Sequence, residues 1–94
     1  MIATHLTNHA RRQSQRRGVM PSTLDLVLNH SDKSRKLPGQ ARAVWISRTG
    51  RDRLKWGGFA PADIDRTRGV RLIVNTNEDV VVTVEHMLAR RAWA

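Results

Sequence analysis

The sequence predicts an α+β domain in which N-terminal helices are followed by a small antiparallel β-sheet of about three strands, with a helical insert. Two patterns lead to this expectation. Apolar residues near the N-terminus recur at helical spacing, whereas later runs rich in Val and Ile have the composition of strands. Size is a third argument, because 94 residues, of which 39% are hydrophobic, can bury one core and not two. We therefore expect a single domain over residues 1–94, with frayed ends at 1–6 and 92–94.

The first expected helix runs from His9 to about Arg17. Thr7 or Asn8 can cap its start, because a side-chain oxygen there accepts a hydrogen bond from a backbone N–H of the first turn. Gly18 suits the position just beyond the helix end, where the backbone often takes a left-handed conformation. The spacing therefore predicts a short helix with a defined beginning and end.

The second expected helix follows Pro21, has Ser22 or Thr23 as its cap, and ends near Asn29. Residues 31–40 are polar and contain a Pro-Gly pair, which predicts a loop. Three apolar residues of the helix recur at the spacing of one helix face: Leu24, Val27 and Leu28.

Three later runs are expected to form strands, at residues 41–47, 70–74 and 80–84, because each contains consecutive β-branched or aromatic residues. Residues 75–79 are polar and turn-forming, so the last two runs should form a hairpin. Residues 87–93 are expected to finish the chain as a helical or frayed tail.

Two short helices are expected in the insert between the first two strands, at residues 49–56 and 61–64. Glycines stop both of them, and Pro61 is favoured at the first position of a helix. Leu54 and Trp56 of the first of these helices are expected to be partly buried.

The three tryptophans are candidates for stacking on nucleic-acid bases, with a core role as the alternative. We expect Trp45 in the sheet core and Trp56 as the better exposed candidate. Trp93 is expected to pack the tail against the body of the domain or against a partner.

The chain is strongly basic, with 17 Lys and Arg against 8 Asp and Glu and a formal net charge of +9. Fourteen of these cations are Arg, whose planar guanidinium suits phosphates and bases, although a GC-rich genome also raises Arg content. We expect a polyanionic partner, with an ordinary solvated surface as the alternative reading. The residues predicted to bind nucleic acid or a protein partner are Arg11, Arg12, Arg16, Arg17, Arg48, Arg51, Arg53, Lys55 and Trp56.

Histidines near these cations suggest a metal-free ribonuclease. His9, Arg12, Gln13 and Arg16 are spaced at i, i+3, i+4 and i+7, which places them on one face of the first helix. His86 ends the last expected strand and can face the same groove. RNA cleavage needs a base, an acid and cations around a charged transition state, so we predict His9 and His86 as the catalytic residues. The alternatives are a capping or packing role for His9 and a surface position for His86.

Several classes of protein are excluded by what the chain lacks. It has no cysteine, hence no disulfide and no thiolate metal site. No histidine pair with a carboxylate on a helix and no cofactor motif occurs, so we expect neither a metal nor a cofactor; His5 and His30 are expected on the surface. No apolar run approaches the ~20 residues that cross a bilayer. The N-terminus lacks the features of a secretion signal, and we expect a cytoplasmic protein.

The segment from Thr7 to Val19 resembles a family signature. Thr7-Asn8-His9-Ala10, followed by Gln15-Arg16-Arg17-Gly18-Val19, is similar to the pattern H-A-x-x-R-x-x-Q-R-G-I of a small bacterial domain family of uncertain function seen near toxin systems. A strand ending Thr83-Val84-Glu85-His86 resembles a later block of that family. The order of elements is similar to the RelE/ParE and BrnT group of small basic toxins, over about residues 5–91. That resemblance implies messenger-RNA cleavage and an acidic antitoxin as partner.

Three functions remain open. The first is a toxin-like ribonuclease or RNA binder acting on RNA or an RNA–protein complex. The second is a non-catalytic binding protein, such as a phage-encoded inhibitor of a bacterial defence complex, that grips an acidic protein surface or a guide RNA. The third is a DNA-binding regulator, which the sequence disfavours because the second helix is apolar rather than basic.

Overall fold

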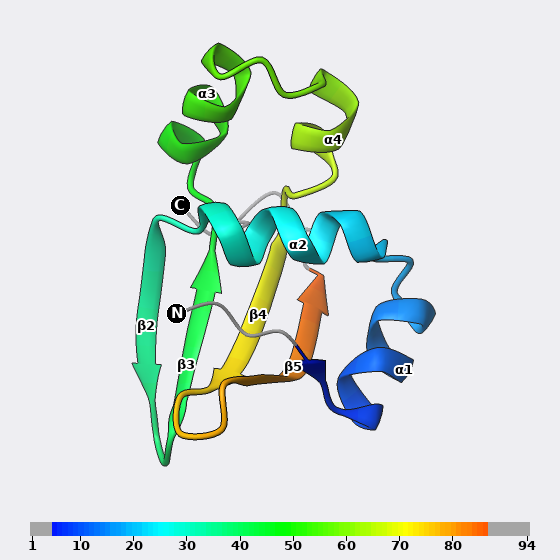
Figure 1. Ribbon diagram of the computed structural model, residues 1–94, viewed down its shortest axis with the longest axis vertical. Coiled ribbons are helices and arrows are strands. Elements are labelled where there is room, and N and C mark those ends of the chain that lie inside the picture. Colours follow the sequence, from blue (N-terminus) through cyan, green and yellow to red (C-terminus); the bar gives the residue numbers. More distant parts are fainter. Residues whose placement is uncertain (1–4, 87–94) are drawn as a thin grey trace.

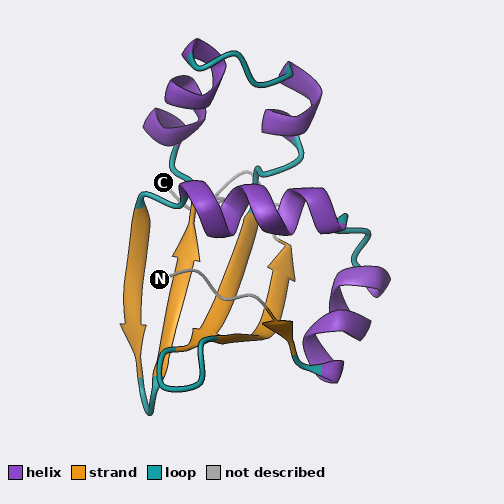
Figure 2. Ribbon diagram, in the orientation of Figure 1, coloured by secondary structure: helices purple, strands orange, loops and turns teal. Residues whose placement is uncertain are grey.

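The computed structural model describes residues 5–86, in which two helices precede a β-hairpin, and two further helices precede a second hairpin (Figures 1 and 2). Within these residues no helix combines the length and the apolar character that crossing a membrane requires. The elements are β1 (His5–Leu6), α1 (Asn8–Arg16), α2 (Pro21–His30), β2 (Lys33–Leu37), β3 (Ala41–Trp45), α3 (Arg48–Trp56), α4 (Pro61–Asp65), β4 (Val70–Asn75) and β5 (Val80–His86).

The strands form one sheet in the order β1-β5-β4-β3-β2. From β2 to β5 all neighbours are antiparallel, whereas the two-residue β1 pairs in parallel with the start of β5, His5 opposite Val80 and Leu6 opposite Val81. The predicted α+β class, with helices ahead of the strands and a helical insert, is confirmed. The expected number of antiparallel strands is one too low, because this part of the sheet has four.

The additional antiparallel strand is β2, in the segment predicted to be a loop. That prediction is wrong because Lys33 to Leu37 pair residue by residue with β3, from Lys33 opposite Trp45 to Leu37 opposite Ala41. Four of the five residues are exposed, so β2 lacks the alternation of polar and apolar residues that marks a half-buried strand. Charged residues on an edge strand oppose pairing with other chains. Backbone pairing with β3 therefore makes Lys33–Leu37 a strand, and the side chains of this segment show no strand pattern in the sequence.

The core lies between α2 and the face of the sheet that α2 crosses (Figure 1). Leu24 and Val27 of α2 are buried in one cluster with Leu72 of β4 and with Val81 and Val84 of β5. Burying one such side chain contributes about 1.5–3 kcal/mol. The apolar side of α2 is therefore used to hold the sheet, as its spacing predicts.

The ends of α1 agree with the prediction. Thr7 is the N-cap, and its Oγ1 accepts a hydrogen bond from the Ala10 backbone N at 3.1 Å. Gly18 has a φ of 68°, the left-handed conformation expected after the helix. The insert is confirmed as well, since α3 ends before Gly57 and α4 begins at Pro61.

The start of α2 differs from the prediction. Its N-cap is Met20, which makes no side-chain capping bond, and Ser22 and Thr23 lie inside the first turn. Pro21 explains this, because proline has no backbone N–H to satisfy and its fixed φ already suits a helix. The assignment of Ser22 or Thr23 as the cap is therefore wrong.

The tryptophans differ sharply in exposure. Trp45 is half-buried in β3, whereas Trp56, at the end of α3, is 82% exposed. Leu54 is buried in the core, with 4% of its surface exposed. The expectation that Leu54 and Trp56 are both partly buried is therefore wrong, and Trp56 fits its other assignment as an exposed aromatic residue. Trp93 and the expected tail at 87–93 lie outside the described residues.

Candidate nucleic-acid interface

Helix α1 is fixed beside β5 by hydrogen bonds at two levels. The backbone N of Thr7 donates to the carbonyl oxygen of Val81 at 2.9 Å. Further along, the backbone N of Val84 donates to Oε1 of Gln13 at 3.0 Å. The first bond joins the N-cap of α1 to the start of β5, and the second joins the middle of α1 to a later residue of β5. Helix and strand therefore run in the same direction.

Gln13 has a structural role in this arrangement. The strand β1 covers only the first two residues of β5, so later backbone groups on this edge of β5 need another partner. Gln13 is half-buried and supplies that partner to Val84. The sequence places Gln13 on the face of His9, Arg12 and Arg16, but its side chain turns to the strand.

Replacing Gln13 by Leu should lower the free energy of unfolding by about 1–3 kcal/mol, because the N–H of Val84 loses its acceptor in a partly buried site. Urea unfolding followed by circular dichroism measures the change. The matched control is Gln15→Leu, on the exposed side of the same helix, which should change stability by less than about 0.5 kcal/mol. Equal losses for the two variants would contradict the role of Gln13.

The exposed arginines of α1 and its C-cap, together with the exposed His9, form what we call the α1 surface. Ala10 and Ser14 are the buried residues of the helix, and every Arg of the segment is exposed. Within residues 5–86 none of these Arg side chains forms a hydrogen bond or an ion pair. The α1 surface consists of His9, Arg11, Arg12, Arg16 and Arg17.

In the described part of the chain, the acidic side chains that form ion pairs lie outside the α1 surface. Asp63 pairs with Arg66 at 3.0 Å and Asp65 contacts Arg68 at 3.8 Å, both on or next to α4. Glu85 of β5 pairs with Arg71 of β4 at 2.6 Å. These acids thus neutralise cations close to themselves, and the α1 surface keeps its positive charge.

The two predicted catalytic histidines are not brought into contact. His9 is exposed in the first turn of α1, and His86 is half-buried at the end of β5. Gln13 lies one turn beyond His9 and bonds to Val84, two residues before His86. Along the direction of helix and strand, His9 and His86 are therefore separated by one helical turn plus two strand residues, or ~12 Å. Within the described residues neither imidazole has a hydrogen-bond partner that would orient it.

Helix α3, which carries the second group of predicted contact residues, is anchored at its first turn. The hydroxyl of Ser47 accepts a hydrogen bond from the Gly50 backbone N at 3.1 Å and donates to the carboxylate of Asp32. The Ser47 backbone N also donates to Asp32, at 2.7 Å. A Cβ on Gly50 would lie 2.8 Å from Oδ1 of Asp32, so a side chain there would displace the carboxylate. Partial burial raises the pKa of Asp32, but the bonds from Ser47 outweigh it and hold the pKa below its ordinary value.

A surface cavity of about 260 Å³, open to solvent, lies between α3 and the α4 region. Arg48, Arg51 and Lys55 line it from one face of α3, at the spacing i, i+3 and i+7. Arg68, which follows α4, lines it from the other side and is absent from the predicted contact residues. The remaining lining residues are Asp52, Pro61, Ile64 and Asp65.

The other two predicted contact residues of α3, Arg53 and Trp56, are exposed but do not line the cavity. Arg53 lies near enough to Asp32 to stabilise its negative charge. Helix α3 therefore presents its predicted contact residues on different sides, and only three of them converge.

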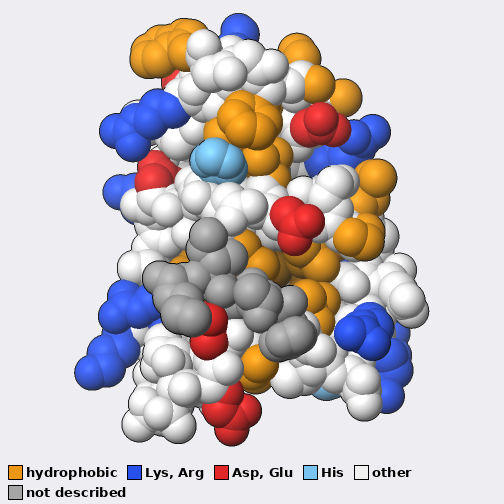
Figure 3. Space-filling model, in the orientation of Figure 1, with side chains coloured by type: hydrophobic (Ala, Val, Ile, Leu, Met, Phe, Trp, Pro, Cys, Tyr) orange, Lys and Arg blue, Asp and Glu red, His pale blue; other side chains and the backbone are white. Residues whose placement is uncertain are grey.

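The basic groups occupy separate parts of the molecule. Helix α1 lies beside the β5 edge of the sheet, whereas α3 and α4 lie beyond the end of the sheet where β3 ends and β4 begins (Figure 1). Viewed on the α2 side, Lys and Arg side chains gather near the edges, including the α1 region at the lower right and the β2 region at the lower left (Figure 3). All the predicted contact residues except the half-buried Arg51 are exposed, but the structure does not unite them into one groove, and their role in binding stays a prediction.

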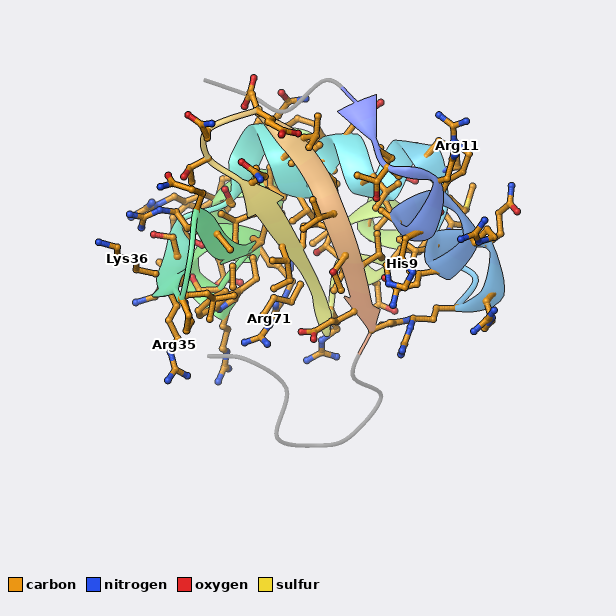
Figure 4. The ribbon with its side chains drawn as sticks, turned by 90° about the horizontal axis from the view of Figure 1, so that it is seen from below. His9, Arg11, Arg35, Lys36 and Arg71 are labelled. Carbon is orange, nitrogen blue, oxygen red and sulfur yellow. The ribbon has the colours of Figure 1, made fainter. Side chains whose placement is uncertain are left out.

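A further basic group on the β2–β3 hairpin is missing from the predicted contact residues. Arg35 points away from α2, as Arg71 does, whereas Lys36 extends outward from the sheet edge (Figure 4). On α1, by comparison, Arg11 and His9 lie on different sides of the helix (Figure 4). The exposed cations of this hairpin, called the hairpin cations below, are Lys33, Arg35, Lys36 and Arg42.

Comparisons of this protein with protein-family models, with curated proteins and with solved structures gave no match.

Proposed function

We propose that this protein binds RNA through the α1 surface. The observation that carries the proposal is the set of four exposed arginines on one short helix and its C-cap, none of which is neutralised by an acid within residues 5–86. Each guanidinium that contacts a phosphate releases condensed counterions, which makes binding favourable at low salt. Arg also offers a planar fork that can bind two phosphate oxygens at once.

Single-stranded RNA fits the chain better than a DNA duplex does. In a helix-turn-helix protein the second helix reads the major groove, but here the second helix, α2, packs its apolar side on the sheet and carries no Lys or Arg. Exposed aromatic side chains beside cations are typical of single-strand binding, because they stack on unpaired bases. Trp56 is 82% exposed and follows Lys55, and so provides such a stacking surface on α3, at a distance from the α1 surface that only an RNA strand extending beyond α1 would span. The order of elements predicted from the sequence is similar to that of a group of small basic toxins whose members include messenger-RNA ribonucleases, and this similarity favours the same choice.

Titration of a fluorescently labelled single-stranded RNA of about 20 nucleotides with the intact protein tests the proposal. We expect saturable binding at about 50 mM salt that weakens by at least ~10-fold at about 200 mM salt, because phosphate contacts dominate. Absence of saturable binding at the lower salt would contradict it. Polyglutamate serves as a competitor, and displacement of RNA by an equal charge of polyglutamate would favour an acidic protein partner instead.

Ribonuclease activity is a second candidate, because His9 lies on the exposed side of α1 at helical spacing from Arg12 and Arg16. In such a reaction His9 accepts the proton of a 2′-hydroxyl that attacks the neighbouring phosphate, and the leaving 5′-oxygen takes a proton from an acid or water. The products end in a 2′,3′-cyclic phosphate and a 5′-hydroxyl. A denaturing gel of the same titration shows whether cleavage occurs. This candidate requires cleavage that is abolished in His9→Ala and kept in the control His30→Ala.

A further inference from the structure

The cavity between α3 and α4 differs from the α1 surface because its cations converge. Arg51 is half-buried, and its guanidinium NH1 donates to the Ile46 carbonyl oxygen at 3.0 Å. That bond fixes the orientation of the side chain while using only one of the five N–H donors of the group. Arg48 and Lys55 lie one turn to either side on the same face of the helix. The site is therefore partly preorganised, which lowers the entropic cost of binding an anion.

The positive charge of this cavity exceeds its negative charge. Four cations line it against two carboxylates, those of Asp52 and Asp65. The contact between Asp65 and Arg68 is long, at 3.8 Å, and both side chains are largely exposed. Burial, followed by the nearby charge of Arg68, lowers the pKa of Arg51 below its ordinary value. The cations thus repel one another, and an anion placed among them would relieve that repulsion.

Charge and size together select the class of anion. The excess of cations matches a phosphomonoester, which carries a charge of about −1.5 to −2 at neutral pH, better than a phosphodiester or a single carboxylate. Pockets for drug-sized ligands usually measure about 300–1,000 Å³. The cavity, at about 260 Å³, is smaller than that range and open to solvent, so it can hold a phosphoryl group while the rest of the ligand extends outward.

We propose that the cavity between α3 and α4 is a phosphomonoester-binding site, in which Arg51 and Arg48 hold the phosphoryl oxygens and Lys55 and Arg68 complete the charge balance. The ligand is either the terminal phosphate of an RNA or a free sugar phosphate, since both present the same group. This site is separate from the α1 surface and does not depend on RNA binding there.

Titration of the isotopically labelled full chain with inorganic phosphate, at constant ionic strength, tests the site by the shifts of backbone amide resonances. We expect saturable shifts at Arg48, Arg51 and Arg68, with saturation in the millimolar range or below. The variant Arg48→Gln should weaken binding by ~10-fold, since the guanidinium that it removes makes a charge-assisted bond worth about 1.4 kcal/mol. The matched control Arg66→Gln removes one exposed cation outside the cavity and should leave the affinity unchanged.

A second arm distinguishes the two sources of the phosphate. RNA with a 5′-phosphate that binds at least ~10-fold tighter than the same RNA with a 5′-hydroxyl, with amide shifts in the cavity, identifies the RNA end as the ligand. A mononucleotide that binds as tightly as the phosphorylated RNA identifies a free sugar phosphate. Shifts that remain linear in phosphate concentration, or equal weakening by Arg48→Gln and Arg66→Gln, would overturn the site. The phosphate titration can also be run on a variant in which all four α1 arginines are replaced by glutamine. Failure of RNA binding at α1 and failure of the cavity site can therefore be told apart.

Discussion

Replacing the four arginines of α1 by glutamine, in R11Q/R12Q/R16Q/R17Q, is expected to weaken the binding of single-stranded RNA by ~100-fold or more at about 100 mM salt. The slope of log K against log salt should become shallower by about 0.7 for each phosphate that the variant no longer neutralises. The fold should persist, because these side chains are exposed and make no side-chain bond within residues 5–86. Fluorescence anisotropy measures the affinity, and circular dichroism confirms the helix content.

The hairpin cations provide a control with the same change of net charge. The variant K33Q/R35Q/K36Q/R42Q also removes four positive charges from exposed positions. Loss of long-range attraction alone would weaken RNA binding equally in both variants. We expect the hairpin variant to bind RNA more weakly by ~10-fold at most. A larger effect in the hairpin variant than in the α1 variant would place the interface on β2 and β3 instead.

Truncation of Leu72 to Ala is expected to cost about 3 kcal/mol or more of folding free energy, a large loss in stability for a single substitution. Leu72 is fully buried on β4, between β3 and β5, and belongs to the cluster that α2 covers. The change removes apolar packing and leaves a cavity that the surrounding strands cannot fill. For a domain of this size the melting temperature should fall by ~10–20 °C. Thermal unfolding followed by circular dichroism checks the shift.

Leu37→Ala makes the same chemical change on the edge strand β2. Leu37 is only half-buried, so its truncation should cost less than about 1.5 kcal/mol. Comparable costs at Leu72 and Leu37 would show that the energetic centre of the domain does not lie between α2 and β4. RNA affinity measured well below the melting temperature should be unchanged in both variants, because neither residue belongs to the α1 surface.

The parts of the fold that could be predicted are those specified by neighbouring residues. Thr7 and Gly18 delimit α1 through local backbone chemistry, and the Val-rich runs of β4 and β5 identify a hairpin. The strand β2 could not be found in this way, because its residues are polar and its pairing with β3 determines its structure. The pairing of β1 with β5 joins residues more than seventy positions apart and leaves no local pattern.

The sequence predicts which residues of the candidate site are basic and exposed, but it does not predict how they are arranged in space. The exposure of Arg12 and Arg16 follows from the helical period, but the turn of Gln13 toward Val84 depends on an unpaired strand edge that the sequence does not reveal. Arg48, Arg51 and Lys55 have the i, i+3 and i+7 spacing of one helix face, a pattern that is visible in the sequence although it is not part of the prediction. Arg68 joins them only because α4 folds back beside α3, which is a tertiary event.

Mapping of amide shifts when unlabelled single-stranded RNA is added to the isotopically labelled chain is the most direct test of whether α1 contacts RNA. At about 150 mM salt, where weak non-specific attraction is reduced, we expect the largest shifts at residues 8–17. Shifts confined to residues 33–42, with the resonances of α1 unchanged at saturating RNA, would contradict the central role of the α1 arginines.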